Sequence, residues 1–165
     1  MPQDLKEYTG WYHSPLGWIE ITVNDPGVCK LFFRDAEGCS SDKHLLLDEA
    51  IGQLGEYFSG KLTSFTLPLS PAGTDFQKKV WKELLTIPFG NVITYRDLGI
   101  RLGGNNFTRI VGQANGRNLV SIIIPCHRVI GMNGALTGYG GGLWRKKWLL
   151  EFEQKTNSGF TSVLF

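Results

Sequence analysis

Apolar and polar residues alternate near the start of the chain. Residues 18–23 read Trp-Ile-Glu-Ile-Thr-Val, so their aliphatic side chains share one face, and this pattern predicts a strand. Residues 28–33 form a second β candidate, and the Asp-Pro-Gly before them is a turn signal. Apolar residues then recur at helical spacing over 47–58, and Gly60 suits the end of that helix. The chain is therefore predicted to begin with a small α/β unit.

The middle of the chain changes from strands to helices. Two prolines and a glycine over 67–73 predict a linker. Thr74, with Gln77 three residues on, forms a capping-box pattern. This pattern predicts a helix over 75–86, which is followed by a proline and a glycine that end the region.

Two shorter helices are predicted next. Thr94 with Asp97 indicates an N-cap for a helix near 95–102. Residues 103–106 read Gly-Gly-Asn-Asn and break the chain, and 107–115 can form a further helix. Helix, short glycine-containing turn and helix is the spacing of a helix-turn-helix, although many helical hairpins share it.

An apolar segment and a basic segment complete the pattern. Residues 120–124 are predicted to form a buried strand, and 143–154 a basic amphipathic helix. The expected fold class is therefore α+β. A small N-terminal α/β domain over 1–73 would precede a mainly helical domain over 74–165, with a winged-helix-like helix-turn-helix.

Charge is distributed unevenly between these two parts. Residues 1–74 carry 5 Lys/Arg and 10 Asp/Glu, a net charge of −5, whereas residues 75–165 carry 12 and 5, a net charge of +7. A basic half beside an acidic half suggests a polyanion such as nucleic acid as the partner of the basic half. An ordinary solvated surface is the alternative.

Cysteine usage and hydropathy indicate the cellular compartment in which the protein works. Three cysteines without CxxC spacing argue against a disulfide framework and for a reducing compartment: Cys29, Cys39 and Cys126. No apolar run approaches the ~18 residues of a membrane span, and the N-terminus lacks a signal-peptide pattern. We therefore expect a cytoplasmic or nuclear protein without a membrane partner. His13 and His44 form no metal-ligand pattern with the cysteines, so no metal is expected.

Cys126 is the candidate nucleophile. It follows the apolar segment and Pro125, which places it at a strand end or turn, where scaffolds present reactive groups. Only about a few per cent of a free cysteine is thiolate at neutral pH, so a base such as His127 would activate it. Adjacent side chains point apart, so His127 would act more easily through a water, with a carboxylate on its far nitrogen. The alternative is a buried structural cysteine beside a solvent-facing histidine.

Two further side chains and one loop are candidates for function. Tyr95 could donate a proton to a leaving oxygen, or could be a core aromatic. Arg109, on the second helix of the predicted helix-turn-helix, could reach a nucleic acid or could be a solvated arginine. The glycine-rich segment 138–142 could let the backbone approach a ligand closely, but it lacks the ending of a phosphate-binding loop.

The segment Pro-Cys-His-Arg-Val at 125–129 resembles the O6-alkylguanine-DNA alkyltransferase family (methylated-DNA–protein-cysteine methyltransferases). Its surroundings are similar to the family as well, over 76–95, 112–118, 138–143 and 147–150. The close resemblance covers about 74–153, with a weaker match at 14–17.

This resemblance implies a role for each matched residue. Cys126 resembles the alkyl acceptor, His127 its water-mediated base, and Glu153 the carboxylate that orients this base. Tyr95 is similar to the tyrosine that protonates the guanine and helps turn the nucleotide out of the stack. Arg109 is similar to the finger that fills the gap left in the duplex.

Further matched residues would bind DNA or line the pocket. Asn118 resembles the asparagine that braces the turn between recognition helix and active site, and Gly112 and Thr94 fall on the same DNA-binding side. Tyr139 would wall the base pocket, and the main chain of Val129 would face the guanine edge. The remaining pocket residues implied are Gly140 and Asn115.

The chain departs from the family pattern at a few positions. Recognition helices of the family usually carry alanines at positions that are occupied here by Phe107, Thr108 and Ile110. This difference would affect the affinity for DNA and the depth of docking, but not the chemistry. Gly140 replaces a serine or alanine, which removes a hydrogen bond to O6 or widens the pocket. Residues 154–165 extend past the resemblance.

The function implied is stoichiometric, irreversible repair of double-stranded DNA. An alkyl group, such as methyl, would pass from O6 of a flipped-out guanine to Cys126, and O4-alkylthymine stays open as a second substrate. A thioether does not exchange as a disulfide does, so the protein would act once, as a monomer and without a cofactor. Three alternatives remain: a lesion-binding protein without chemistry, a helix-turn-helix regulator, and a Cys/His hydrolase. The presence of Cys126 disfavours the first, and its adjacency to His127 disfavours the last.

Overall fold

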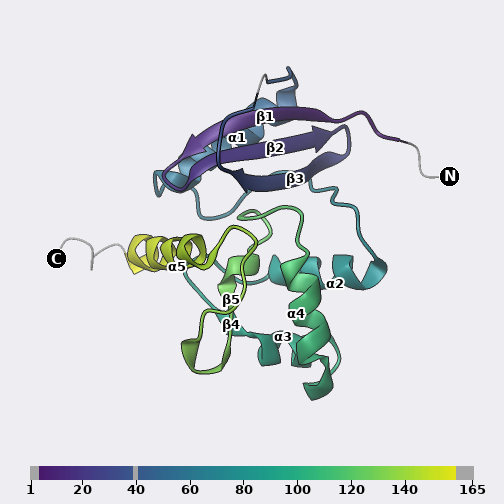
Figure 1. Cartoon of the computed structure of the whole chain (residues 1–165), viewed down its shortest axis with the longest axis vertical. Helices are drawn as coiled ribbons and strands as arrows, with labels where there is room; N and C mark the ends of the chain where they lie inside the picture. The colour runs from purple at the N-terminus through teal and green to yellow at the C-terminus, as the bar shows by residue number, and fades with distance from the viewer. Residues whose placement is uncertain (1–3, 39–40, 159–165) are drawn as a thin grey trace. The chain divides into compact units, whose positions relative to one another are not determined.

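The computed structural model describes residues 4–38 and 41–158 (Figure 1). The chain divides into two compact units, Met1–Ala72 and Gly73–Phe165. Cys39 and the last part of the C-terminal tail, 159–165, lie outside the described residues. Among the described residues, no helix has both the length and the apolar composition that crossing a membrane requires.

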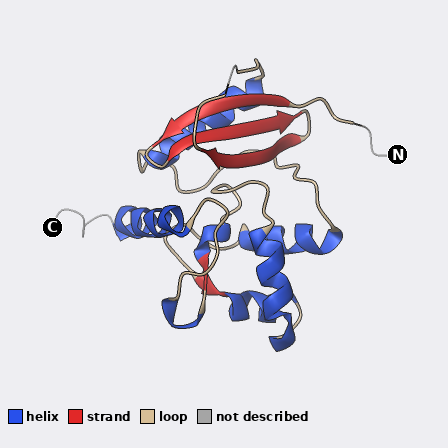
Figure 2. Ribbon diagram, in the orientation of Figure 1, coloured by secondary structure: helices blue, strands red, loops and turns tan. Residues whose placement is uncertain are grey.

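The first unit is built on a three-stranded antiparallel sheet of order β1-β2-β3 (Figure 2). The strands are β1 (Tyr8–Ser14), β2 (Gly17–Asn24) and β3 (Gly27–Arg34), so both predicted strands are confirmed. The aliphatic side chains of β2 form the inner face, with Ile19, Ile21 and Val23 all fully buried. Burying one such side chain stabilises the fold by about 1.5–3 kcal/mol.

Strand β1 is an element that the hydrophobic pattern did not predict. Its fully buried positions are Gly10 and Ser14, not aliphatic residues, so the alternation that reveals β2 is absent. Gly10 lies against α1, where a Cβ atom would meet Leu47 Cδ2 at 2.8 Å. A small residue is therefore required at this point of the sheet because a helix packs directly on it.

Helix α1 (Leu45–Phe58) packs against this sheet (Figure 1). It confirms the predicted helix and ends just before Gly60. His44 is its N-cap, and the Leu46 N–H donates to His44 Nδ1 at 3.1 Å. The buried face is the helical set that the spacing predicts: Leu47, Ala50, Leu54 and Tyr57.

The predicted linker over 67–73 is partly tied into this sheet. Leu69 forms a parallel bridge with Val28, whose N–H donates to the Pro68 carbonyl at 2.8 Å. Ser70 in turn donates its N–H to the Val28 carbonyl at 2.9 Å. The first part of the segment therefore extends the edge at β3, because an edge strand offers main-chain groups that need partners.

The second unit begins with the predicted helices. Helix α2 (Asp75–Leu84) has the predicted capping box of Thr74 and Gln77. Helix α3 (Tyr95–Leu102) has a second one, formed by Thr94 and Asp97. A 3₁₀ turn η1 (Asn105–Phe107) leads into α4 (Thr108–Gly116), and α3 and α4 pack against each other.

The predicted strand over 120–124 is wrong. The segment is a compact turn, with Ile122 at φ +71° and hydrogen bonds from Ile123 N to Ser121 O (2.8 Å) and from Ile124 N to Val120 O (3.0 Å). Val120, Ile122 and Ile124 are nevertheless almost fully buried. A continuous apolar run indicates burial and not its geometry, so sequence periodicity could not distinguish this turn from a strand.

The side chain of Asn118 makes the hydrogen bonds to this turn that a neighbouring strand would otherwise make. Asn118 Nδ2 donates to the Ile124 carbonyl at 2.8 Å, and Asn118 Oδ1 accepts from the Val120 N–H at 3.0 Å. Buried main-chain groups need hydrogen-bond partners, and here one buried amide satisfies two of them. Asn118 thereby fixes the turn that leads to Cys126.

Short elements and one long helix complete the second unit. Turn η2 (Cys126–Arg128) leads into β5 (Val129–Ile130), which pairs in parallel with β4 (Ile93–Thr94), and η3 (Met132–Gly134) follows. Helix α5 (Leu143–Ser158) confirms the predicted basic helix and extends beyond it. Its buried face is not purely apolar as expected, because Lys146 and Glu153 lie there beside Leu149.

Candidate active site

Cys126 lies in a buried 3₁₀ turn rather than at the end of a strand. The residue is only 6% exposed to solvent. The Cys126 N–H donates to the Ile124 carbonyl at 2.8 Å, and its own carbonyl accepts from Asn115 Nδ2 at 3.4 Å. Burial raises the pKa of the Cys126 thiol, while a hydrogen bond with Asn118 and the charge of Lys146 oppose this effect. The resting group is therefore a thiol that needs a base.

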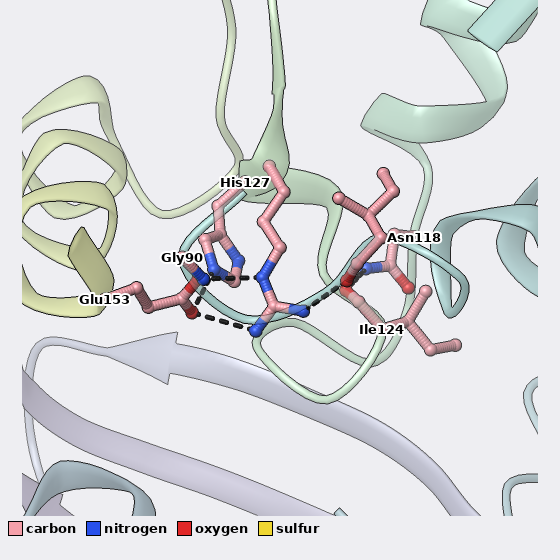
Figure 3. Close-up of polar contacts among 7 residues, drawn as sticks. Gly90, Asn118, Ile124, His127 and Glu153 are labelled. Carbon is pink, nitrogen blue, oxygen red and sulfur yellow. Dashed lines mark hydrogen bonds and ion pairs between the residues drawn. The ribbon is translucent and has the colours of Figure 1, made fainter. Parts of the chain in front are cut away.

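His127 is buried and paired with Glu153 from α5 (Figure 3). The distance from His127 Nε2 to Glu153 Oε2 is 2.7 Å, and the two side chains are 0% and 1% exposed. The alternative of a solvent-facing histidine is therefore wrong. Within the part of the chain that the structure describes, His127 Nδ1 has no hydrogen-bond partner. Burial lowers the pKa of His127, and Glu153 opposes this effect, so the imidazole is neutral at pH 7 with one nitrogen available.

Arg128 holds the same carboxylate from a second side. Arg128 Nε donates to Glu153 Oε1 at 2.7 Å, and Nη2 donates to Oε2 at 3.1 Å. Burial alone would raise the pKa of Glu153, but the neighbouring His127 and Arg128 outweigh it and lower that pKa far below its usual range. Glu153 is therefore ionised, as a carboxylate that orients an imidazole must be.

Tyr95 and Lys146 form a second polar pair. Tyr95 is the first residue of α3, and its hydroxyl donates to the Thr137 carbonyl at 2.9 Å. Lys146 Nζ lies 3.4 Å from this hydroxyl and donates to the Thr137 and Gly138 carbonyls, both at 3.3 Å. Burial lowers the pKa of Lys146 and raises that of Tyr95, and both groups interact electrostatically with Cys126.

Tyr139 and Asn115 lie beside the same residue, Cys126. Burial raises the pKa of Tyr139 well above its usual value, and the charge of the Cys126 thiolate adds to this, while a hydrogen bond with Ser121 opposes it. Asn115, on the buried side of α4, reaches the Cys126 carbonyl. The site is thus one thiol surrounded by an imidazole–carboxylate pair, a phenol–ammonium pair and a second phenol.

Comparisons with known proteins relate both units to one family. The family model described as "6-O-methylguanine DNA methyltransferase, DNA binding domain" matches residues 75–155. The model described as "6-O-methylguanine DNA methyltransferase, ribonuclease-like domain" matches residues 8–71. A methylated-DNA–protein-cysteine methyltransferase of Methanosarcina barkeri is 46% identical over 149 residues, which cover 86% of this chain and 93% of that protein. The chain belongs to the methylated-DNA–protein-cysteine methyltransferase family.

Other relatives agree with this methyltransferase assignment. A methyltransferase of the same name from Mycobacterium bovis is 53% identical over 105 residues, 64% of either chain. The crystal structure of the O6-methylguanine methyltransferase of Mycobacterium tuberculosis superposes with a TM-score of 0.84 at 36% identity, covering 97% of this chain and 100% of that one. A structure of the Mycobacterium tuberculosis OGT in complex with DNA has a TM-score of 0.80 at 40% identity, covering 88% and 93%. The mixed α/β fold is therefore that of this methyltransferase family.

Of the residues expected in a methyltransferase site, the structure gathers some and leaves others apart. Cys126, His127, Glu153 and Tyr95 come together in one unit, as do Asn115, Asn118 and Tyr139. Val129 is fully buried in β5, paired with Ile93. Gly140 is exposed, with nothing within 4 Å of a Cβ atom placed there.

The expected DNA-binding residues lie on α3 and α4. Arg109 is exposed on α4, and Thr94 caps α3. Gly112 of α4 faces Tyr95, since a Cβ atom there would lie 3.6 Å from Tyr95 Cδ1. The hydrogen bonds of Thr94 are with Asp97, at 3.0 Å each, in the capping box of α3.

One departure from the methyltransferase pattern has a structural explanation. Phe107 folds back onto Gly103, where a Cβ atom would meet the ring at 2.1 Å, and packs edge-on against Phe76 of α2 at 6.3 Å between ring centroids. This bulky residue therefore anchors the start of α4, and only Ile110, 41% exposed, adds apolar surface beside Arg109.

Sequence reasoning missed Arg128 and Lys146. In the sequence, Arg128 stands only as part of the motif at 125–129, and Lys146 only as part of a basic helix. The signal for Lys146 was its spacing: Lys146, Leu149 and Glu153 lie three and four residues apart and share one helix face. Within the described residues, no group of three or more His, Cys, Asp or Glu side chains is arranged to hold a metal ion.

Proposed function

We propose that this protein repairs alkylated DNA by transferring the alkyl group from O6 of guanine to Sγ of its own Cys126. The observation that carries the proposal is the buried Cys126 thiol with the His127–Glu153 pair beside it, at 2.7 Å between Nε2 and Oε2, in a chain of this family. The transfer is irreversible because the product is a thioether, so each molecule acts once. The acceptor is the protein itself, and no cofactor is required.

The proposed chemistry begins at His127. Glu153 accepts the Nε2–H, which leaves the lone pair of Nδ1 to take the Cys126 proton through a water. The thiolate then attacks the alkyl carbon in line; the S–C bond forms while the C–O bond breaks, and the electron pair of that bond stays with the guanine.

Tyr95 and Lys146 assist the departure of the leaving group, which is the guanine. Tyr95 donates its hydroxyl proton to the departing guanine, which turns a poor leaving group into a neutral base. The phenolate that forms lies 3.4 Å from the Lys146 ammonium. A buried positive charge at this position stabilises the negative charge that develops on Tyr95 in the transition state.

The DNA-binding part of the proposal concerns α3 and α4. These helices, joined by η1, form a helix-turn-helix, with α4 as the recognition helix. The target atom is buried in a duplex, so the nucleotide has to be flipped out, at a cost of a few kcal/mol. Arg109 on the exposed side of α4 fills the gap, and Asn118 ties α4 to the active-site turn.

The flipped base would lie between the two tyrosines that face Cys126. Tyr139 and Gly140 form the wall from one loop, and Asn115 and the main chain of Val129 face the base from the other side. Two features support DNA as the partner. One is the net charge of +7 over residues 75–165. The other is the DNA complex of the Mycobacterium tuberculosis relative.

The test is a mass measurement on the intact protein after incubation with duplex DNA that contains one O6-methylguanine. The expected result is a gain of one methyl group per molecule, located by peptide mapping on Cys126, with unmodified guanine left in the DNA. A regulator or a lesion-binding protein would gain no mass, and a hydrolase would turn over without staying modified. Either result would refute the proposal.

A further inference from the structure

Arg128 is a buried charged side chain to which the proposed chemistry gives no task. It is 7% exposed and connects three segments of the second unit. Besides its two hydrogen bonds to Glu153 on α5, its Nη1 donates to the carbonyl of Ile87, in the loop after α2, at 2.7 Å. All of the guanidinium nitrogens are therefore engaged, in a geometry that only arginine offers.

The Glu153 carboxylate is surrounded by donors (Figure 3). Oε1 accepts from Arg128 Nε at 2.7 Å and from the Gly90 N–H at 3.4 Å. Oε2 faces His127 Nε2 at 2.7 Å and accepts from Arg128 Nη2 at 3.1 Å. An ionised carboxylate only accepts hydrogen bonds, so the proton between Glu153 and His127 belongs on Nε2.

The two charges of this cluster, Arg128 and Glu153, balance each other. His127 can therefore be neutral without leaving a buried carboxylate uncompensated. If Arg128 lost its charge, the negative charge of Glu153 would be balanced by a second proton on His127 instead, and that proton would occupy Nδ1. An imidazolium cannot accept the proton of Cys126.

Other charged and titratable groups near His127 act in the same direction or are neutral. Lys146 on α5 disfavours an imidazolium, as Arg128 does. Tyr95 and Tyr139 face Cys126 and are phenols at neutral pH, since burial raises both pKa values. Cys126 itself is a thiol in the resting site. Among the described groups around His127, Glu153 alone favours the imidazolium, and Arg128 is its direct counterion.

We propose that Arg128 is a positioning residue that holds His127 as the neutral Nε2–H tautomer and so keeps Nδ1 free as the base for Cys126. The consequence for catalysis rests on the proposed function, but the tautomer itself does not. Arg128 acts through Glu153 and His127 and touches neither the alkyl group nor the guanine.

The direct test is ¹⁵N NMR of the histidine ring in the full-length, unalkylated protein. In the wild type at pH 7, we expect a protonated Nε2 and an unprotonated Nδ1 for His127. In Arg128→Met, Nδ1 should be protonated at the same pH. Arg128→Lys keeps the charge but not the paired hydrogen bonds, and should restore part of the wild-type signal. Arg34→Met is a matched control, because Arg34 pairs with Glu20 at 3.5 Å on the surface of the first unit.

The kinetic test is the pH profile of single-turnover methyl transfer. The rising limb should move up by about one pH unit or more in Arg128→Met, to above pH 7, partly return in Arg128→Lys, and stay in place in Arg34→Met. A merely structural role would lower the rate at every pH without moving the limb.

Two results would overturn the inference. One is a protonated His127 Nδ1 in the wild type at pH 7, which needs no variant to fold. The other is a folded Arg128→Met protein with an unprotonated Nδ1 and an unmoved limb. Should Arg128→Met not fold, either an Nδ1–H in the wild type or an unshifted limb in Arg128→Lys refutes the inference. A wild type that gains no methyl while showing the Nε2–H tautomer would refute the proposed function alone.

Discussion

Among the described residues, each of the two units holds a buried free cysteine. Cys29 on β3 is 4% exposed and Cys126 on η2 is 6% exposed, and burial raises the pKa of both thiols. Their surroundings differ. Cys29 Sγ donates to the Thr22 carbonyl at 3.4 Å within the sheet, and the acidic Glu7 raises the pKa of Cys29 by more than the neighbouring Lys30 lowers it. Around Cys126, an asparagine and a lysine favour the thiolate, and the next residue is a buried imidazole with a free nitrogen.

This comparison shows that burial and reactivity are separate properties of a cysteine. Burial alone keeps a thiol protonated and inert, which suits a core position such as Cys29. The same burial around Cys126 strengthens every electrostatic interaction in the site because the local dielectric is low. A thiol in such a place is reactive only when a base and positive charge are built in beside it.

Replacing each of the two cysteines in turn by alanine tests this comparison. The difference in methyl transfer between the two variants is the largest effect that we expect. Cys126→Ala should abolish methyl transfer completely, because no other nucleophile lies next to His127. Cys29→Ala should leave the stoichiometry and rate of transfer unchanged and should cost about 1 kcal/mol of stability. The mass of each intact variant after reaction with O6-methylguanine DNA shows how much methyl it has gained. Transfer that persists in Cys126→Ala would show that the acceptor has been misassigned.

Removing the base should bring Cys126 closer to the behaviour of Cys29. We expect His127→Gln to slow single-turnover transfer by about 10²–10⁴-fold, the usual contribution of a general base. His13→Gln is the matched control, since His13 is exposed and stacks on Trp18 with ring centroids 4.6 Å apart. A rate within twofold of wild type for His127→Gln would mean that the thiolate forms without this imidazole.

The role of the DNA-binding helix can be separated from that of the thiol site. Arg109→Ala should slow transfer from duplex DNA by about tenfold or more, but not transfer from free O6-benzylguanine, which needs no extrusion from a duplex. Tyr95→Phe should slow both, because it removes the proton donor. Single-turnover rates with the two substrates make the comparison. Equal losses on both substrates for Arg109→Ala would place Arg109 in the pocket or the fold.

The last expected effect is on stability at low pH and not on methyl transfer. The pKa of His127 is lowered in the folded state, so the unfolded chain binds this proton first and stability falls as pH drops below about 6.5. The pKa of Glu153 is also lowered, so a second loss begins below about pH 4.3, at about 1.4 kcal/mol per pKa unit of separation.

Urea unfolding of the full-length protein between pH 7 and pH 2 measures both losses. Glu153→Gln should start about 3–5 kcal/mol less stable at pH 7, because it leaves Arg128 without its counterion, and should lack the second loss. A wild-type protein whose stability is flat from pH 7 to pH 2 would contradict the buried, ionised pair.

Local signals determined most of the secondary structure from the sequence alone. The capping residues Thr74 and Thr94 fixed where two helices begin, because an N-cap satisfies nearby N–H groups and depends on residues within one turn. The alternation over 18–23 gave β2 for the same reason: a strand face repeats every two residues. The resemblance around Cys126 gave the candidate nucleophile, its base and the family.

Only the tertiary structure decided the elements whose partners are distant in sequence. Strand β1 depends on pairing with β2 and on α1 packing over Gly10, and the turn at 120–124 depends on the buried amide of Asn118. Neither has a periodic signal of its own.

The same holds for the charges of the site. The sequence places Cys126, His127 and Arg128 side by side, and the resemblance implies Glu153 as the partner of His127. Only the structure shows that α5 also brings Glu153 to Arg128, and Lys146 to Tyr95. Charges interact through space according to distance and burial, and the chain separation between residues does not enter. The sequence therefore determined which groups are available for chemistry, and the packing of α5 against the η2 turn decided their protonation states.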